Sequence, residues 1–172
     1  VKGMGGAMDL VAAAKNIILT SQGIHLVFDK KYFPGNAAMM IPKTADGRVL
    51  FAVPWHNKVI VGTTDTEIEK PALEPKPLEE EIEFILQHMN KYLQVDVQRS
   101  NVLSVYVGLR PLVIKNKTLK PSLMSRSHTI IVSGSGLVTI TGGKWTSYRK
   151  MGEDAVNNAV FSAKLEKKTC VT

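Results

Sequence analysis

The stretch TIIVSGSGLVTITGGKWTSYRK, residues 129–150, predicts a β-hairpin that leads into a helix. Two runs rich in β-branched residues, 129–132 and 137–141, flank a Ser-Gly-Ser-Gly turn. Gly134 and Gly136 suit this turn because glycine adopts positive φ angles without steric cost. The pattern therefore indicates two antiparallel strands joined by a short connection.

The second strand of this hairpin ends in Gly142-Gly143, immediately before the predicted helix. Paired glycines let the backbone approach a ligand closely, and the first N–H groups of a helix have no intrahelical acceptor. We therefore expect this connection to hold an electron-rich ligand.

The composition is that of a soluble chain, with 44% hydrophobic and 22% charged residues among 172. This length suits one domain with a core, or one and a half smaller domains. The chain has no apolar run of the ~20 residues that span a bilayer, and its first residues do not show the charged, apolar and cleavable series expected of a signal peptide. We therefore expect folding in the cytoplasm. The single cysteine, Cys170, excludes an internal disulfide and a cysteine metal cluster, and no metal site is expected.

The net charge of +7 favours a polyanion or a phosphorylated ligand as partner, although a solvated basic surface explains the same charge. A basic nucleic-acid-binding module is therefore an alternative function. The sequence lacks an aromatic stacking platform and any recognisable nucleic-acid motif, so we expect no nucleic-acid partner.

Branched and aromatic residues predict short strands at residues 17–20, 23–28, 37–42, 49–54, 58–63 and 102–107. The turn signals between the third, fourth and fifth runs indicate an antiparallel meander. In the second run His25 alternates with Ile24 and Leu26, so its side chain faces away from the core that those two residues enter.

Two helices are predicted. Residues 78–94 carry an apolar stripe at helical spacing and three glutamates at the N-terminal end, and this helix should cover the sheet. Residues 145–163 are predicted to form a closing helix with Met151, Ala155 and Ala159 on its buried side, and Val156 is left open as a fourth member. The fold class is therefore α+β, with a mainly antiparallel sheet.

Three cations lie beside strand ends or loops, namely Arg110, Arg126 and Lys144. Pro111 stiffens the backbone at Arg110, so that guanidinium should point in a definite direction. Arginine matches phosphate oxygens with a planar fork, and lysine adds a point charge. Because no acidic cluster is evident to neutralise them, convergence of the three would require an anionic ligand.

Several motifs, taken in order, resemble those of the FAD-dependent glycerol-3-phosphate dehydrogenases, and their separations agree over about residues 17–160. They are Gly23-Ile-His-Leu-Val-Phe28, Pro54-Trp55, Val61-Gly-Thr-Thr-Asp65, Gly108-Leu-Arg-Pro-Leu112, Ser125-Arg126 and Gly142-Gly-Lys-Trp-Thr-Ser-Tyr-Arg149. The resemblance implies a flavoenzyme that oxidises sn-glycerol 3-phosphate to dihydroxyacetone phosphate. Electrons would pass through FAD to quinone, or to oxygen in oxidase relatives.

The resemblance also implies roles for individual residues. Arg110 and Arg126 would bind the substrate phosphate, with Thr63 and Thr64 near the same pocket. His25 is a candidate for proton abstraction or hydroxyl binding. Lys144 would lie beside substrate and flavin as a second catalytic residue. Contacts to the isoalloxazine end of FAD are implied for Gly142, Gly143, Lys144, Trp145 and Thr146.

The sequence departs from the family pattern because it has no Gly-x-Gly-x-x-Gly unit for the ADP half of FAD. We interpret the chain as a fragment, with a substrate-binding domain at residues 17–115 and the C-terminal part of an FAD-binding domain at 127–163. Residues 1–16 and 164–172 are predicted to be mobile ends. The fragment alone should neither bind FAD nor act on substrate. The parent should be cytoplasmic, with peripheral association at the inner face of the cell membrane left open.

Overall fold

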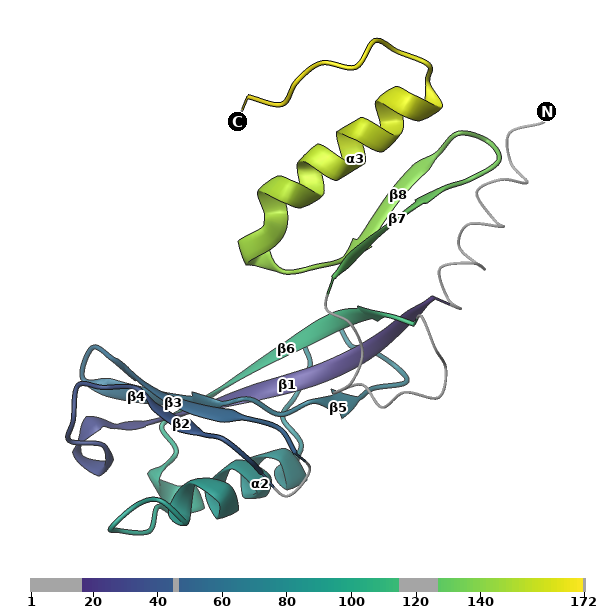
Figure 1. Ribbon diagram of the computed structural model, residues 1–172. Coiled ribbons are helices and arrows are strands. Elements are labelled where there is room, and N and C mark those ends of the chain that lie inside the picture. Colours follow the sequence, from purple (N-terminus) through teal and green to yellow (C-terminus); the bar gives the residue numbers. More distant parts are fainter. Residues whose placement is uncertain (1–16, 45–46, 115–126, 172) are drawn as a thin grey trace. The chain divides into compact units, whose positions relative to one another are not determined.

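The computed structural model describes residues 17–44, 47–114 and 127–171 (Figure 1). Its internal contacts define two compact units. One is Thr20–Arg110, and the other is Pro111–Thr172 together with the N-terminal residues through Leu19. The predicted mobile end at residues 1–16 lies outside the described residues.

The unit Thr20–Arg110 is built on a six-stranded sheet to which β1 and β6 contribute most of their length. The strands are β1 (Ile18–Asp29), β2 (Met39–Ile41), β3 (Leu50–Trp55), β4 (Lys58–Gly62), β5 (Thr66–Glu67) and β6 (Ser104–Val113). Their order is β2-β3-β4-β1-β5, with β6 also paired to β1. The pairs β2-β3, β3-β4, β1-β4 and β1-β5 are antiparallel, which confirms the predicted meander and the α+β class.

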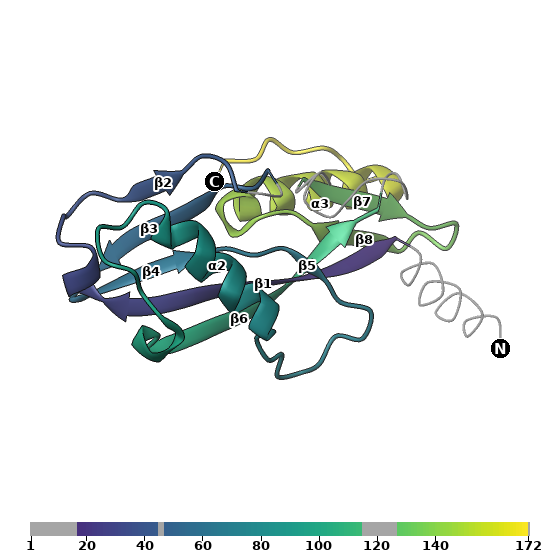
Figure 2. The same ribbon diagram turned by 90° about the horizontal axis from the view of Figure 1, so that it is seen from below.

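Helix α2 (Glu79–Asn90) covers one face of this sheet (Figures 1 and 2). Its apolar stripe is buried as predicted, and the core forms between the stripe and the inward-facing residues of the strands. The fully buried members of this core include Ile24, Leu26, Phe28, Leu50, Val59, Val61, Ile82, Ile85 and Met89. Burial of each such side chain contributes about 1.5–3 kcal/mol to folding.

Helix α2 is shorter than the predicted 78–94 because its last residue diverts the chain. The Asn90 side chain accepts a hydrogen bond from the Val97 N–H at 3.0 Å and donates one to the Val97 carbonyl at 2.9 Å. This pair holds the following segment in a turn, although Leu93 still packs partly buried against the core.

Strand β1 runs without a break where the sequence predicts two separate strands. Ser21 and Gln22, in the predicted gap, pair with Glu67 and Thr66 of β5 and are buried. A polar residue stays in a buried strand when its side chain finds a partner. The Ser21 hydroxyl donates to the Asp65 carboxylate, and the Gln22 side chain donates to the Glu81 carboxylate.

Strand β6 extends past the predicted end at residue 107 and includes Arg110 and Pro111. It runs antiparallel to β1, since the Leu103 N–H bonds the Val27 carbonyl and the Ile114 N–H bonds the Ile17 carbonyl. Proline is tolerated in a strand where its missing N–H faces away from a partner. Arg110 is therefore held by a strand and not by a loop.

The other unit contains the predicted hairpin and closing helix. Strands β7 (His128–Val132) and β8 (Val138–Gly142) pair antiparallel, and the segment η4 (Trp145–Ser147) leads into α3 (Tyr148–Ser162). Of the two turn glycines only Gly136 has a positive φ, at 84°. No residue of α3 is fully buried, because Met151 and Ala155 on the predicted buried face are only half-buried and Ala159 is exposed.

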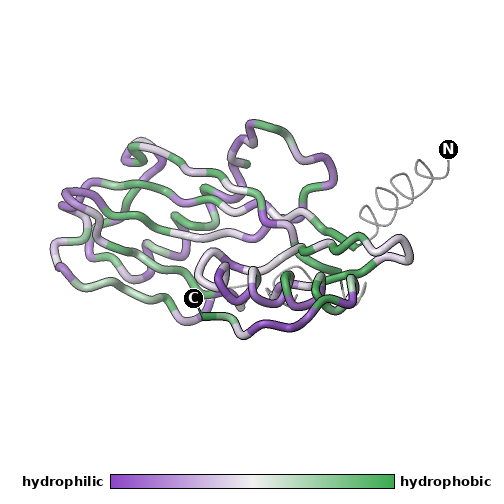
Figure 3. The backbone as a smooth tube through the Cα atoms, turned by 90° about the horizontal axis from the view of Figure 1, so that it is seen from above, coloured by the Kyte–Doolittle hydropathy of each residue, from purple (hydrophilic) through white to green (hydrophobic). Residues whose placement is uncertain are grey.

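Two further short 3-10 turns complete the described elements, η1 (Lys30–Tyr32) and η2 (Arg99–Asn101). Hydrophobic residues run along the strands of the larger sheet, whereas α3 carries many hydrophilic residues (Figure 3). Within the described ranges, no helix has the length and apolarity needed to cross a membrane.

Candidate functional site

The guanidinium of Arg110 is fixed by the segment that follows β4. One terminal nitrogen donates to the Thr63 hydroxyl at 2.9 Å, and the other donates to the Thr64 carbonyl at 3.2 Å. The latter nitrogen also lies 3.7 Å from a carboxylate oxygen of Asp65. The Arg110 side chain keeps 24% of its surface exposed, so this fixed side chain is not fully enclosed.

Asp65 corrects the expectation that no acidic group accompanies the predicted cations. Its side chain is only 2% exposed, and it accepts a hydrogen bond from the Ser21 hydroxyl in addition to facing Arg110. A charge buried this deeply requires a charged or hydrogen-bonding partner. Asp65 therefore orients Arg110 and partly offsets its charge.

Gly23 leaves the space that the Arg110 guanidinium occupies. A Cβ atom at this position of β1 would overlap the guanidinium itself. Residue 23 faces the same side of the strand as residue 25, because side chains alternate along a strand. Arg110 therefore lies across β1 on the face that carries His25.

Gly62 has the same relation to His25. It pairs with His25 across β1 and β4, and a Cβ atom there would overlap the imidazole ring. The His25 side chain is half-buried, while Ile24 and Leu26 on either side are fully buried, which confirms the predicted orientation. The peptide bond that follows Gly62 is cis.

The pKa of His25 is lowered below its ordinary value of 6.5, first by burial and then by the positive charge of Arg110. The imidazole is therefore neutral at pH 7 and can accept a proton. Among the residues that the structure describes, none hydrogen-bonds the ring, so its nitrogens remain open to a ligand.

A buried carboxylate, that of Glu81, lies beneath this site. It accepts hydrogen bonds from the hydroxyls of Thr64 and Thr66, each at 2.8 Å, and from the Gln22 side chain at 2.7 Å. The Leu78 N–H at the start of α2 donates a fourth, at 3.1 Å. Glu81 thereby connects the helix to β1 and to the segment that holds Arg110.

Thr63 and Thr64 consequently differ in what they offer a ligand. Thr63 is half-buried and bonds Arg110 directly. The Thr64 hydroxyl is fully buried, accepts from the Ile24 N–H at 3.0 Å and donates to Glu81. Its contribution to the site is the carbonyl that orients Arg110. Sequence reasoning missed both acidic residues, Asp65 and Glu81, because their partners are distant in the chain.

The predicted ligand segment of the other unit has the expected backbone. Gly142 and Gly143 adopt φ values of 73° and 87°, which side chains disfavour. A Cβ at Gly142 would lie 2.9 Å from the Val113 side chain, and one at Gly143 would meet Met151. Both positions therefore require glycine for conformation and for space.

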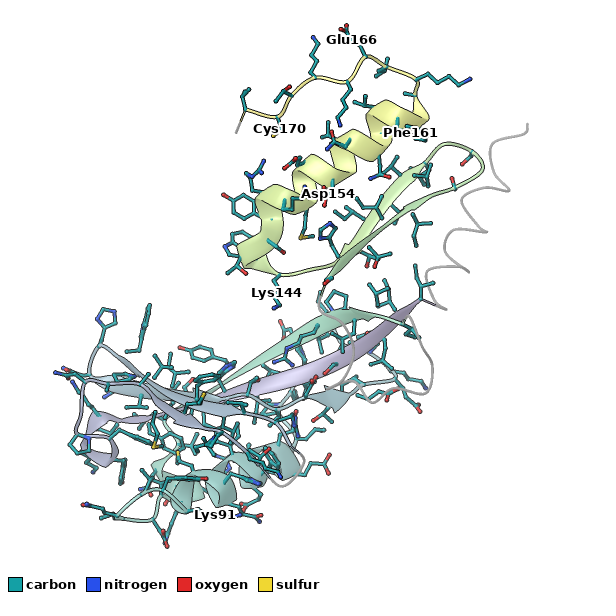
Figure 4. All side chains as sticks on the ribbon, viewed as in Figure 1. Lys91, Lys144, Asp154, Phe161, Glu166 and Cys170 are labelled. Atoms are coloured by element: carbon teal, nitrogen blue, oxygen red, sulfur yellow. The ribbon has the colours of Figure 1, made fainter. Side chains whose placement is uncertain are left out.

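The start of the helical segment presents unused donors. The N–H groups of Trp145 and Thr146 have no acceptor in the part of the chain that the structure describes. Both residues are exposed, as is Lys144, whose side chain extends from the connection between β8 and the helix (Figure 4).

The structure thus brings His25, Arg110 and Thr63 together on one face of the sheet, with Thr64 beneath them. Gly142, Gly143, Lys144, Trp145 and Thr146 form a second cluster in the other unit. Arg126 lies outside the described residues. Within those residues, no group of three or more His, Cys, Asp or Glu side chains is arranged to hold a metal ion.

Comparison with known proteins reveals extensive similarity. Residues 3–149 match the family described as FAD dependent oxidoreductase (DAO). The mitochondrial glycerol-3-phosphate dehydrogenase of Arabidopsis thaliana is 43% identical over 159 residues, which cover 92% of this chain and 25% of that protein. The human mitochondrial glycerol-3-phosphate dehydrogenase is 43% identical over 155 residues, covering 89% of this chain and 21% of that protein.

A solved structure is also similar. The glycerol-3-phosphate dehydrogenase of Bacillus halodurans complexed with FAD superposes with a TM-score of 0.72 and 33% identity. The match covers 89% of this chain and 29% of that one. The chain therefore spans about a quarter of the length of the proteins that it resembles.

These comparisons correct the expected location. The plant, human and Schizosaccharomyces pombe relatives are named mitochondrial, and these names contradict the expected cytoplasmic location. The absence of an evident targeting segment in these 172 residues was therefore no guide to location.

Proposed function

The chain belongs to the FAD dependent oxidoreductase family, and we propose that it provides the substrate-binding part and a flavin-binding segment of a glycerol-3-phosphate dehydrogenase. One observation carries this proposal. A fixed, partly exposed arginine and a neutral histidine lie on the same face of one sheet, each over a glycine.

The arrangement suits a small ligand that bears both an anion and a hydroxyl group. Residues 23 and 25 are neighbours on one face of β1, and such neighbours are about 7 Å apart. Arg110, lying over Gly23, would bind the phosphate, with Thr63 beside it. His25, lying over Gly62, would bond the hydroxyl at the carbon to be oxidised. Glycerol 3-phosphate carries both groups.

His25 would act as the proton acceptor in the oxidation. Burial and the charge of Arg110 keep its pKa low, so the ring is neutral and can take the hydroxyl proton of the substrate. Arg110 would keep the phosphate in place while this transfer occurs. FAD, when bound, supplies the acceptor for the hydride that leaves the same carbon.

The residues of the second cluster fit such a cofactor. Gly142 and Gly143 carry no side chain of their own and adopt positive φ angles, and the N–H groups of Trp145 and Thr146 have no acceptor among the described residues. These donors would bond the electron-rich end of the isoalloxazine, and Lys144 would lie beside it. Arg126 is proposed as a second phosphate ligand on the basis of its motif alone.

The domain assignment is part of the same proposal. Residues 17–115 would form the substrate-binding domain, and residues 127–163 the C-terminal part of the FAD-binding domain. The division of the contacts near residues 19 and 110 supports it.

The electron acceptor is proposed to be a quinone, because the relatives are named dehydrogenases and not oxidases. Quinones dissolve in membranes, so the protein would associate peripherally with one. The names of the relatives support a mitochondrial location.

The test is anaerobic mixing of the FAD-loaded gene product that contains this chain with glycerol 3-phosphate, followed by flavin absorbance. We expect the oxidised flavin band to bleach with glycerol 3-phosphate and to persist with glycerol at the same concentration. Bleaching to the same extent with both compounds would reject the phosphate as a recognised group. Persistence with both would reject the proposed activity.

A further inference from the structure

We propose that His128 and Asp154 are positioning residues that hold the connection between β8 and α3 in the conformation needed for flavin binding. This connection is defined as residues 143–147. The inference rests on the proposed function, because it concerns the segment assigned there to FAD. It adds two residues that lie outside all the motifs on which that function is based.

His128 joins both ends of the connection. As the first residue of β7 it pairs with Gly142, the last residue of β8. Its Nε2 atom lies 3.0 Å from a carboxylate oxygen of Asp154, in the second turn of α3. The strand that precedes the connection and the helix that follows it are therefore both bonded to His128.

The connection also packs directly on His128. A Cβ atom at Gly143 would lie 3.2 Å from the Cβ of His128 and would overlap the Met151 side chain. The backbone of Gly143 thus rests between β7 and α3. If the His128 to Asp154 contact were lost, α3 could move away from β7, and the backbone would lose this support.

Asp154 has a second partner, Lys150, whose Nζ lies 2.9 Å from its other carboxylate oxygen. The two partners of Asp154 differ in surroundings. The Lys150 side chain is 58% exposed and belongs to the same helix, whereas the His128 side chain is 20% exposed and belongs to the hairpin. Only the histidine connects two elements.

The Asp154 carboxylate is ionised at neutral pH. Lys150 and His128 both lower the pKa of Asp154, with the lysine having the larger effect. Asp154 therefore accepts hydrogen bonds as an ionised group, which roughly doubles their strength relative to neutral pairs.

Lys150 provides a matched control, since Lys150→Met removes a cation from the same carboxylate without touching the hairpin. His128→Phe keeps a ring of similar size but cannot bond Asp154. His128→Gln retains a side-chain N–H and should restore the contact. Together the three variants distinguish the effect of the His128 to Asp154 hydrogen bond from the effect of a cation beside Asp154 and from the packing of the ring.

The measurement is FAD affinity of the apoprotein prepared from the full gene product, followed by flavin fluorescence well below the melting temperature of each variant. We expect His128→Phe to weaken FAD binding about five- to tenfold, equivalent to the loss of one hydrogen bond. His128→Gln should recover most of that loss, and Lys150→Met should stay within about twofold of wild type, as exposed pairs contribute little. Hydrogen exchange of the amides at 143–147 should accelerate in His128→Phe alone.

A merely structural pair would lower the melting temperature without changing FAD affinity or local exchange, and that result would overturn the inference. Equal effects of His128→Phe and Lys150→Met would also overturn it. If His128→Phe does not fold, Asp154→Ala removes the other partner of the same hydrogen bond. FAD affinity and hydrogen exchange of that variant then test the inference in the same way. Wild-type protein that binds no FAD would reject the proposed function itself, whereas unaltered binding in the variants would reject only this inference.

Discussion

Replacement of Arg110 by alanine is expected to lower kcat/KM for glycerol 3-phosphate about ten- to a hundredfold in the FAD-loaded gene product. The guanidinium is held by Thr63 and Thr64 and remains partly exposed, so it is already oriented for a ligand. A hydrogen bond to a charged group contributes about 1.5–3 kcal/mol, and each ~1.4 kcal/mol changes the rate constant tenfold. The lost contact accounts for the whole expected effect.

The same substitution should also lower stability. The nearly buried carboxylate of Asp65 loses the cation 3.7 Å away, although the Ser21 hydroxyl still donates to it, and Thr63 and Thr64 lose their bonds to the guanidinium. We therefore expect the free energy of unfolding to fall by about 1–3 kcal/mol, so kcat/KM is compared at a temperature where both proteins are fully folded. Urea unfolding of wild type and variant measures this difference.

Lys58→Ala is the matched control. It removes one positive charge from the same sheet, where Lys58 pairs with Asp29 at 3.2 Å, and should leave kcat/KM unchanged. Glycerol, which lacks the phosphate, is the matched substrate. Arg110→Ala should reduce the preference for glycerol 3-phosphate over glycerol by the same ten- to hundredfold. An equal loss of rate with both substrates would refute the assignment of Arg110 to the phosphate.

Three further outcomes are expected. The acid limb of the pH profile of kcat/KM should lie below pH 6.5, since burial and Arg110 lower the pKa of His25. Arg110→Ala removes one of these two causes and should move the limb to higher pH. An unmoved limb would exclude His25 as the titrating group. Lys144→Met should slow flavin reduction, measured by rapid mixing, more than it raises KM, and a normal reduction rate would assign Lys144 to the surface. The isolated 172-residue chain should not bind FAD in a calorimetric titration. A few hydrogen bonds of about 1 kcal/mol each at residues 142–146 do not offset the entropic cost of at least ~4 kcal/mol for capturing a ligand. A tight stoichiometric complex would contradict this expectation.

The regular elements could be predicted where one local signal dominates. The apolar stripe of α2 and the hairpin pattern of β7 and β8 each repeat over several turns or residues, and both elements exist near the predicted bounds. Strand β1 was divided wrongly at Ser21 and Gln22, since polar residues normally end a buried strand. Their partners, Asp65 and Glu81, lie 44 and 59 residues away, beyond the reach of local patterns.

The candidate site was predictable only in part, and for the same reason. The position of Arg110 before a proline and the alternation around His25 indicated directed side chains. Neither pattern could reveal that Asp65 is the carboxylate partner of Arg110 or that Glu81 supports Thr64. Such contacts join β1, the end of β4 and α2, and they exist only once the sheet and helix have assembled.

The assembled sheet also explains why glycine occupies positions 23 and 62. Glycine inside a strand weakens it, because the unfolded chain loses more entropy and no side chain packs. Here the two glycines lie on adjacent strands, and the volume above each is filled by a side chain with a polar head, Arg110 over one and His25 over the other. An ordinary sheet would place two more apolar side chains there and would be more stable. The two glycines therefore let a guanidinium and an imidazole lie close to the backbone, as the proposed binding of glycerol 3-phosphate requires.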